Sequence, residues 1–174
     1  MRFYLDYCIG HCPWLMHLLV LRLKKYGALD ACLFVAALAL FAVNEHLIKP
    51  AVLGAASASG SLAEGGSAAG FSFAELIILG HFNDFLGGLA FMAYTNLLIS
   101  LVEPRFRIRN PFIGVAYIFC CGLFWEYAAP LFVPDSVSDP WDVLAYSLGS
   151  VAYWVVRTVG SRRRHAGGAG TIDT

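Results

Sequence analysis

Residues 33–43 read Leu-Phe-Val-Ala-Ala-Leu-Ala-Leu-Phe-Ala-Val, a run in which every side chain is apolar. The run lies inside a longer apolar segment, residues 28–48, and roughly 20 such residues are enough for an α-helix to cross a bilayer. Similar segments follow at residues 82–102, 111–132 and 139–159. The sequence therefore predicts an all-α fold, a polytopic membrane helix bundle of about four transmembrane helices, in one domain over residues 1–160.

The composition supports this class of protein. Hydrophobic residues make up 59% of the 174 residues and charged residues only 14%, whereas a soluble domain is about half apolar and a quarter charged. The formal net charge is zero, so no nucleic-acid partner is expected, and the lipid bilayer is the expected surrounding. No signal peptide is evident. The cysteines have no regular spacing, Cys8-Ile-Gly-His-Cys12 is a weak metal-binding pattern, and we expect no metal or cofactor.

Several boundaries follow from breaks in the apolar pattern. Residues 1–25 include an apolar stretch too short to span, and we interpret them as an interfacial helix. Lys49-Pro50 is expected to end the first span, and the Gly-, Ala- and Ser-rich residues 54–70 are expected to form a loop. Residues 71–80 are apolar but too short to span, which favours an interfacial helix or a lead-in to the second span. The basic, Gly-rich residues 161–174 are predicted to form a disordered cytoplasmic tail.

The basic residues predict the orientation. With four spans, eleven of the twelve lysines and arginines fall on one side: Arg2, Arg22, Lys24, Lys25, Arg105, Arg107, Arg109, Arg157, Arg162, Arg163 and Arg164. Only Lys49 falls on the other side. Because lysine and arginine accumulate in short cytoplasmic loops, both termini of this multi-pass cell-membrane protein are expected to be cytoplasmic.

The acidic residues have the opposite bias, since eight of the twelve map to the outer side or to the outer end of a span. An ionisable residue at membrane depth is costly and is a functional-site candidate. Each span brings polar groups to this outer level. The predicted ligand-binding residues are His81, Asn83, Asp84, Trp125, Glu126, Ser138, Asp139, Trp141 and Asp142, and no residue is predicted to be catalytic.

Structural roles compete with ligand binding at the same positions. Asp139 and Asp142 suit the first turn of a helix that begins Asp-Pro-Trp-Asp, and Asn83 or Asp84 could cap the second span. The tryptophans fit an interfacial aromatic belt, and Glu126 could form a hydrogen bond between two helices. Small residues at Gly87, Gly88 and Ala90 and at Ala145 and Gly149 predict close helix contacts beside these acids.

Two of these segments resemble the VanZ-like group of small bacterial membrane proteins. They are His81-Phe82-Asn83-Asp84-Phe85-Leu86-Gly87-Gly88 and Asp139-Pro140-Trp141-Asp142-Val143-Leu144-Ala145-Tyr146-Ser147-Leu148-Gly149. Asp142, Val143 and Gly149 fit the motif of the last span, Tyr146 replaces the asparagine that is usual there, and Phe124-Trp125-Glu126 resembles an acid-bearing third span. The resemblance covers roughly residues 80–158. It implies a four-helix protein of the bacterial cell envelope and a role in tolerance of glycopeptide antibiotics.

Three functions remain open from the sequence. The favoured one is a non-enzymatic envelope protein whose outer acidic cluster binds a lipid headgroup, a lipid-linked precursor or another amphiphile, such as a lipopeptide or glycopeptide. Such a ligand needs a cationic part or a bridging divalent cation. The others are a small proton- or cation-coupled transporter and a membrane-embedded lipid-modifying hydrolase, although no hydrolase motif is evident. Oligomerisation stays open.

Overall fold

The computed structural model describes residues 14, 16–58, 73–132 and 139–168, and every regular element in these ranges is helical. In chain order these elements are η1 (Leu23–Gly27), α2 (Ala28–Val43), η2 (Asn44–Ile48), α3 (Lys49–Ala58), α4 (Phe73–Gly80), α5 (Phe82–Val102), η4 (Pro104–Phe106), α6 (Pro111–Leu123), η5 (Phe124–Ala128), η6 (Ala129–Leu131) and α7 (Pro140–Gly168). The all-α class is thus confirmed over the described residues.

The first helix is much longer than the predicted span 28–48. One continuous helix of 40 residues runs over Met16–Ala55. At 1.5 Å per residue it is about 60 Å long, roughly twice the hydrocarbon thickness of a bilayer. Residues 16–25 therefore continue this helix instead of forming a separate interfacial one, and Lys49-Pro50 does not end it. Part of the predicted loop, residues 54–58, is also helical.

The passage of the helix through Pro50 has a local cause. Residues Asn44–Ile48 form a π-helical turn, in which the Lys49 N–H bonds to the Asn44 carbonyl five residues earlier. This turn shifts the hydrogen-bond register just before Pro50, which has no N–H to donate. The chain can therefore continue as α3 without the missing bond ending the helix.

The later helices agree more closely with the predicted spans. α5 coincides with residues 82–102, and α6 with η5 and η6 covers most of residues 111–132. Asn110 caps α6, because its side chain accepts from the Phe112 N–H at 2.9 Å, with Pro111 in the first turn. α7 continues to Gly168, so residues 161–168 of the predicted tail are helical, and residues 169–174 lie outside the described part.

Three of the described helices are long and apolar enough to cross a membrane: Met16–Ala55, Phe82–Val102 and Pro111–Ala128. α7, which corresponds to the fourth predicted span, is not among them, and it contains Asp142 and Arg157. Large apolar side chains such as Val35, Phe112 and Val155 are exposed on α2, α6 and α7. Exposed apolar surface of this extent suits a lipid surrounding.

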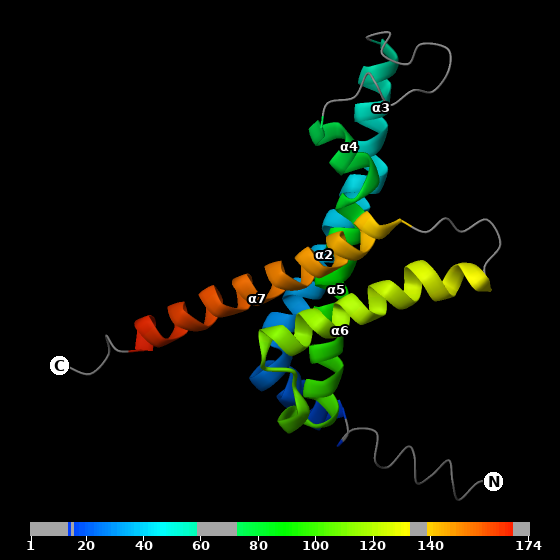
Figure 1. Cartoon of the computed structure of the whole chain (residues 1–174). Helices are drawn as coiled ribbons and strands as arrows, with labels where there is room; N and C mark the ends of the chain where they lie inside the picture. The colour runs from blue at the N-terminus through cyan, green and yellow to red at the C-terminus, as the bar shows by residue number, and fades with distance from the viewer. Residues whose placement is uncertain (1–13, 15, 59–72, 133–138, 169–174) are drawn as a thin grey trace, which may run out of the picture.

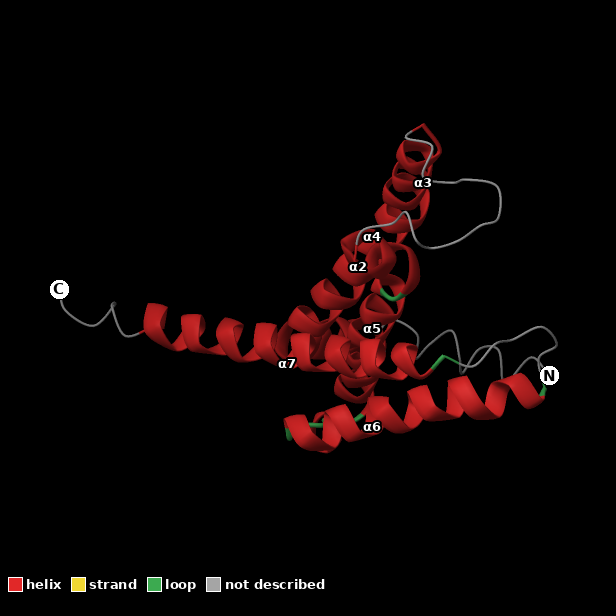
Figure 2. Ribbon diagram, turned by 45° about the horizontal axis from the view of Figure 1, so that its top comes forward, coloured by secondary structure: helices red, strands yellow, loops and turns green. Residues whose placement is uncertain are grey.

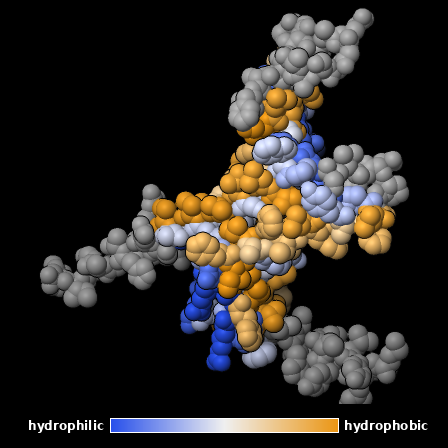
Figure 3. All heavy atoms as spheres, viewed as in Figure 1, coloured by the Kyte–Doolittle hydropathy of each residue, from blue (hydrophilic) through white to orange (hydrophobic). Residues whose placement is uncertain are grey.

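The helices form two antiparallel pairs. α2 and α5 make one pair, and α6 and α7 run side by side across it, as Figures 1 and 2 show from two directions. α5 is central because it packs against both α2 and α7. Figure 3 shows hydrophobic residues over the middle of the molecule, with hydrophilic residues gathered at the lower end and in a smaller patch above.

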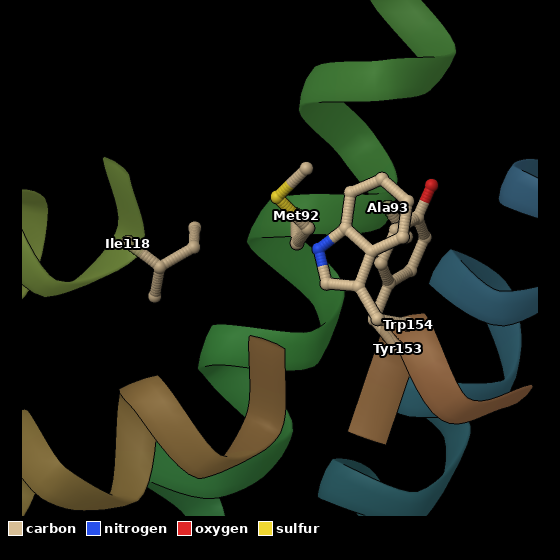
Figure 4. Close-up of a cluster of buried hydrophobic side chains, with 5 residues drawn as sticks. All are labelled: Met92, Ala93, Ile118, Tyr153 and Trp154. Carbon is tan, nitrogen blue, oxygen red and sulfur yellow. The ribbon is translucent and has the colours of Figure 1, made fainter. Parts of the chain in front are cut away.

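Two close approaches of the backbone hold α5 against α7. A Cβ atom added to Gly88 would lie 2.1 Å from the Tyr146 carbonyl oxygen, and one added to Gly149 would lie 2.0 Å from the Phe85 carbonyl oxygen. Only glycine fits at such distances, so the predicted contact between these small-residue faces is confirmed. A buried core follows at the level of the next turns, where side chains from three helices meet (Figure 4): Met92, Ala93, Ile118, Tyr153 and Trp154.

Candidate functional site

Five of the predicted site residues come together where three helical segments begin or end. His81 immediately precedes α5 and Asp84 lies in its first turn, Glu126 lies in η5, and Asp139 and Asp142 are at the start of α7. We call these five residues the acidic cluster. Its members come from sequence positions up to 61 residues apart, so the fold and not the local chain brings them together.

His81 and the aspartates are in direct contact. The Nδ1 atom of His81 lies 2.8 Å from Oδ1 of Asp142, with side chains 36% and 22% exposed, so this pair is reachable from solvent. One donor atom each from His81, Asp139 and Asp142 lie within 4.8 Å of one another. The Asp84 carboxyl interacts with the Asp142 carboxyl and with the Tyr146 hydroxyl. Neighbouring carboxylates repel each other, so their proximity favours a cation beside them.

Glu126 is the most buried acid of the cluster, with 6% of its surface exposed. It lies in the π-helical turn Phe124–Ala128, and such turns recur at functional sites. Its Oε2 atom accepts a hydrogen bond from the Asp139 backbone N–H at 3.1 Å, which ties η5 to the start of α7. Glu126 thus forms the hydrogen bond between helical segments that was considered as an alternative to ligand binding, and it remains a member of the acidic cluster.

Asp139 caps α7, whereas neither of the two residues predicted as possible caps of α5 does so. Oδ1 of Asp139 accepts from the Trp141 N–H at 2.9 Å, so Asp139 is the N-cap of α7. α5 begins at Phe82 with His81 as N-cap and no side-chain cap bond, so neither Asn83 nor Asp84 caps it. Asp84 does not cap α5, although an acid in the first turn is favoured by the helix dipole.

Asn83 does not belong to the cluster, contrary to the prediction. Its side chain donates to Glu45 Oε2 at 2.6 Å and accepts from the Asn44 amide at 2.9 Å, so it faces η2 and not α7. Glu45 also pairs with Lys49 at 2.9 Å. Neighbouring positions on a helix point about 100° apart, which is why Asn83 and Asp84 serve different contacts. Asn83 ties α5 to the first helix.

The two predicted tryptophans are on the surface, and Trp125 and Trp141 are 62% and 65% exposed. Trp125 lines an apolar groove of about 560 Å³ between α5, α6 and α7, together with Gly87, Phe91, Tyr117 and Tyr146. Tyr146 joins the two features, because it lines the groove and its hydroxyl interacts with Asp84. Ser138 lies outside the described residues.

The acidic cluster carries more acid than base. In the described ranges, the ion pairs of lysine and arginine join Lys49 to Glu45, Arg105 to Glu103, and Arg107 and Arg157 to Asp30. His81 is the basic partner that the described chain provides for Asp142. The geometry therefore favours a cation, or the cationic part of a larger ligand, at this site.

A second polar network was not predicted and lies toward the opposite end of α5. We call it the Asp30 network. The Asp30 carboxylate is fully buried and accepts hydrogen bonds from Arg157 and the Tyr153 hydroxyl, each at 2.7 Å, and from Arg107. Burial lowers the pKa of the Arg107 guanidinium, an effect that the Asp30 charge opposes, and an arginine stays protonated in either case.

The network continues into α5 and the following loop. The Asn96 side chain donates to the Tyr153 hydroxyl at 2.9 Å and accepts from the Ile108 N–H at 3.0 Å. Arg107 also donates to the Tyr26 carbonyl. The first helix, α5, the loop before α6 and α7 are thus held by one set of bonds, which marks it as structural.

An apolar layer separates the two polar groups. Asp84 and Asn96 are twelve residues apart on α5, which corresponds to about 18 Å along the helix axis. The core residues Met92, Ala93 and Ile118 lie in the interval along α5 and beside it. Within the described residues no hydrogen bonds link the two groups, although the buried Ser150 lies between Tyr146 and Tyr153 on α7.

No protein-family model, no curated protein and no solved structure matches this chain. The resemblance to the VanZ-like group stays a prediction that depends on the two quoted segments alone.

Proposed function

We propose that the chain is a four-span membrane protein that binds an amphiphile at its outer face. The head group would lie at the acidic cluster and the apolar part in the adjoining groove. The observation that carries this proposal is the position of Tyr146, which lines the apolar groove and whose hydroxyl interacts with Asp84. A site with an acidic end and an apolar end suits a molecule with the complementary two parts.

The proposed topology has both termini in the cytoplasm and α7 as the fourth span. It is supported by the contacts of the basic residues, since Arg107 and Arg157 meet at Asp30, at the opposite end of α5 from the acidic cluster. α7 is not among the helices that are apolar enough to cross a membrane, and the charged Arg157 lowers its mean hydropathy. The Asp30 carboxylate compensates that charge, which lowers the cost of placing it in or near the bilayer.

Cysteine labelling tests this topology. In a cysteine-free background, single cysteines replace Ser59, Asn110, Ser136 or Ser161, and intact cells are treated with a membrane-impermeant maleimide. We expect labelling at positions 59 and 136, and labelling at 110 and 161 only after the membrane is permeabilised. Labelling at 110 but not at 136 in intact cells would show that the orientation is inverted.

Binding is favoured over transport and hydrolysis. A transporter needs a path across the membrane, and the apolar layer between the two polar groups offers none within the described residues. A hydrolase needs an activated nucleophile or water, and the sequence shows no hydrolase motif. The VanZ-like resemblance implies the same kind of role at the outer face, and the proposal does not depend on it.

The binding proposal is tested with a twelve-carbon quaternary ammonium amphiphile that carries bromine on its chain. Bromine quenches tryptophan, so an amphiphile in the groove should quench Trp125 of the protein in nanodiscs in a saturable manner. Asp84→Asn should weaken its binding about tenfold, because the ammonium loses a nearby carboxylate in a medium of reduced dielectric. The measurement is the dissociation constant from the quenching curve.

Matched controls separate the head-group effect from a general disturbance. Asn83→Ala alters the neighbouring residue, which faces away from the cluster, and should leave the dissociation constant unchanged. A maltoside with the same brominated chain has no charge and should bind both proteins equally. Trp125→Phe should remove the saturable quenching. Equal affinities of the ammonium compound for the Asp84→Asn protein and the unmodified protein would contradict the proposal.

A further inference from the structure

We propose that His81, Asp139 and Asp142 form a binding site for a divalent transition-metal ion of the zinc or manganese type. This inference differs from the sequence-based expectation of no metal, and it does not rest on amphiphile binding. It follows from the donor atoms, their spacing, the charge around them and their access to solvent.

The three donor atoms have nearly the spacing of ligands on one ion. An ion about 2.1 Å from each nitrogen or oxygen ligand holds those ligands roughly 3.4 Å apart in tetrahedral geometry. One atom each from His81, Asp139 and Asp142 lie within 4.8 Å of one another, and His81 Nδ1 is already 2.8 Å from Asp142 Oδ1. The aspartate side chains would have to rotate to bring all three donors onto one ion, and Asp142 and Asp139 both carry a second carboxylate oxygen for this.

Each donor retains the capacity to bind an ion. Asp139 uses Oδ1 to cap α7, and a carboxylate has a second oxygen with its own lone pairs. Nδ1 of His81 lies 2.8 Å from Asp142 Oδ1 and donates a hydrogen bond to that carboxylate, so an ion that binds here would take the place of this proton. All three residues are partly exposed, so an ion can enter from solvent.

The donor types indicate the class of ion. Imidazole suits zinc and the other first-row transition metals, whereas magnesium and calcium prefer sites made of oxygen alone. One imidazole with two carboxylates is a three-ligand set of the kind that leaves a coordination position open. We therefore expect Zn²⁺ and Mn²⁺ to bind and Mg²⁺ to compete poorly.

The surrounding charge supplies a second reason for a cation here. Asp84 interacts with Asp142, so a further carboxylate adjoins the three ligands. The lysine and arginine ion pairs of the described chain lie elsewhere, at Glu45, Glu103 and Asp30. His81 alone cannot compensate the negative charge that these three aspartates can carry, whereas a divalent ion beside them could.

Electron paramagnetic resonance of Mn²⁺ tests the site in the full chain, purified in nanodiscs of uncharged lipid without any amphiphile. Bound Mn²⁺ should show electron spin echo modulation from one imidazole nitrogen, and Zn²⁺ should displace it whereas equimolar Mg²⁺ should not. His81→Gln should abolish the nitrogen modulation, and Asp142→Asn should weaken binding by at least about tenfold. His46→Gln, which removes an exposed imidazole from η2, should change neither.

Asp139→Asn keeps the fold testable, because asparagine caps a helix as well as aspartate does but is a poorer metal ligand. It should weaken Mn²⁺ binding while circular dichroism shows an unchanged melting temperature. The proposal is overturned if Mn²⁺ does not bind above the background of protein-free nanodiscs. It is also overturned if the nitrogen modulation survives in His81→Gln or is lost in His46→Gln. Amphiphile binding can succeed or fail separately, since no amphiphile is present.

Discussion

Replacing Asp30 with asparagine is expected to destabilise the protein by about 3–5 kcal/mol, the usual cost of removing one partner from a buried ion pair. The carboxylate is fully buried and accepts from Arg107, Arg157 and Tyr153. Asparagine has a similar shape and can still accept one hydrogen bond. The loss therefore comes from two guanidinium groups that keep their charges in a partly buried place and lose the charge that compensates them.

The measurement is the free energy of unfolding from SDS titration of the protein in mixed micelles, followed by far-UV circular dichroism. Glu103→Gln is the matched control, because Glu103 pairs with the exposed Arg105 at 3.8 Å and such pairs contribute at most about 1 kcal/mol. The double variant Asp30→Asn with Arg107→Gln should lose less than the sum of the two single variants. Additive losses, or a small loss for Asp30→Asn alone, would show that the network does not hold the helices together.

Replacing Gly88 with alanine is expected to destabilise the fold by about 3 kcal/mol, at the upper end of what overpacking usually costs. The added Cβ atom would lie 2.1 Å from the Tyr146 carbonyl oxygen. That oxygen belongs to the backbone of α7 and cannot rotate away, so α5 and α7 must separate. Since Tyr146 also connects the groove to Asp84, the same change should weaken amphiphile binding.

Gly87→Ala is the control for this prediction, one residue away on the same helix. Its Cβ would lie 3.6 Å from the Tyr146 ring, which is ordinary van der Waals contact, and alanine favours the helix over glycine by about 1 kcal/mol. We therefore expect Gly87→Ala to be neutral or stabilising in the same SDS titration. If the two alanine variants behave alike, the close approach of α5 and α7 at Gly88 does not exist in the membrane.

The parts of the fold that could be predicted have clear polar boundaries. α5 agrees with the predicted span because its apolar run lies between His81 and Glu103-Pro104. The first helix could not be bounded in this way, because the π-helical turn at Asn44–Ile48 lets the chain pass a proline that would ordinarily end a helix. Such a turn has no sequence signal that composition or periodicity reveals.

The acidic cluster could be predicted because an acid inside an apolar run is uncommon, and the alternation of spans then places Asp84, Glu126 and Asp142 at one level. The direction of a side chain around its helix could not be predicted, so Asn83, which faces η2, was grouped with residues that face α7. The Asp30 network was missed for a related reason. Asp30 near the start of the first predicted span and Arg157 near the end of the last were both available signals, but only tertiary packing pairs them.

The Asp30 network also has a consequence for biogenesis. Asp30 belongs to the Met16–Ala55 helix, while its partners Arg107, Tyr153 and Arg157 follow 77, 123 and 127 residues later in the chain. Asp30 therefore enters the membrane before any of these partners is made. Arg107 is the first of them to become available, and the set is complete only when α7 docks. A nonsense mutation that removes α7 would therefore leave Asp30, in the Met16–Ala55 helix, without its partners Tyr153 and Arg157.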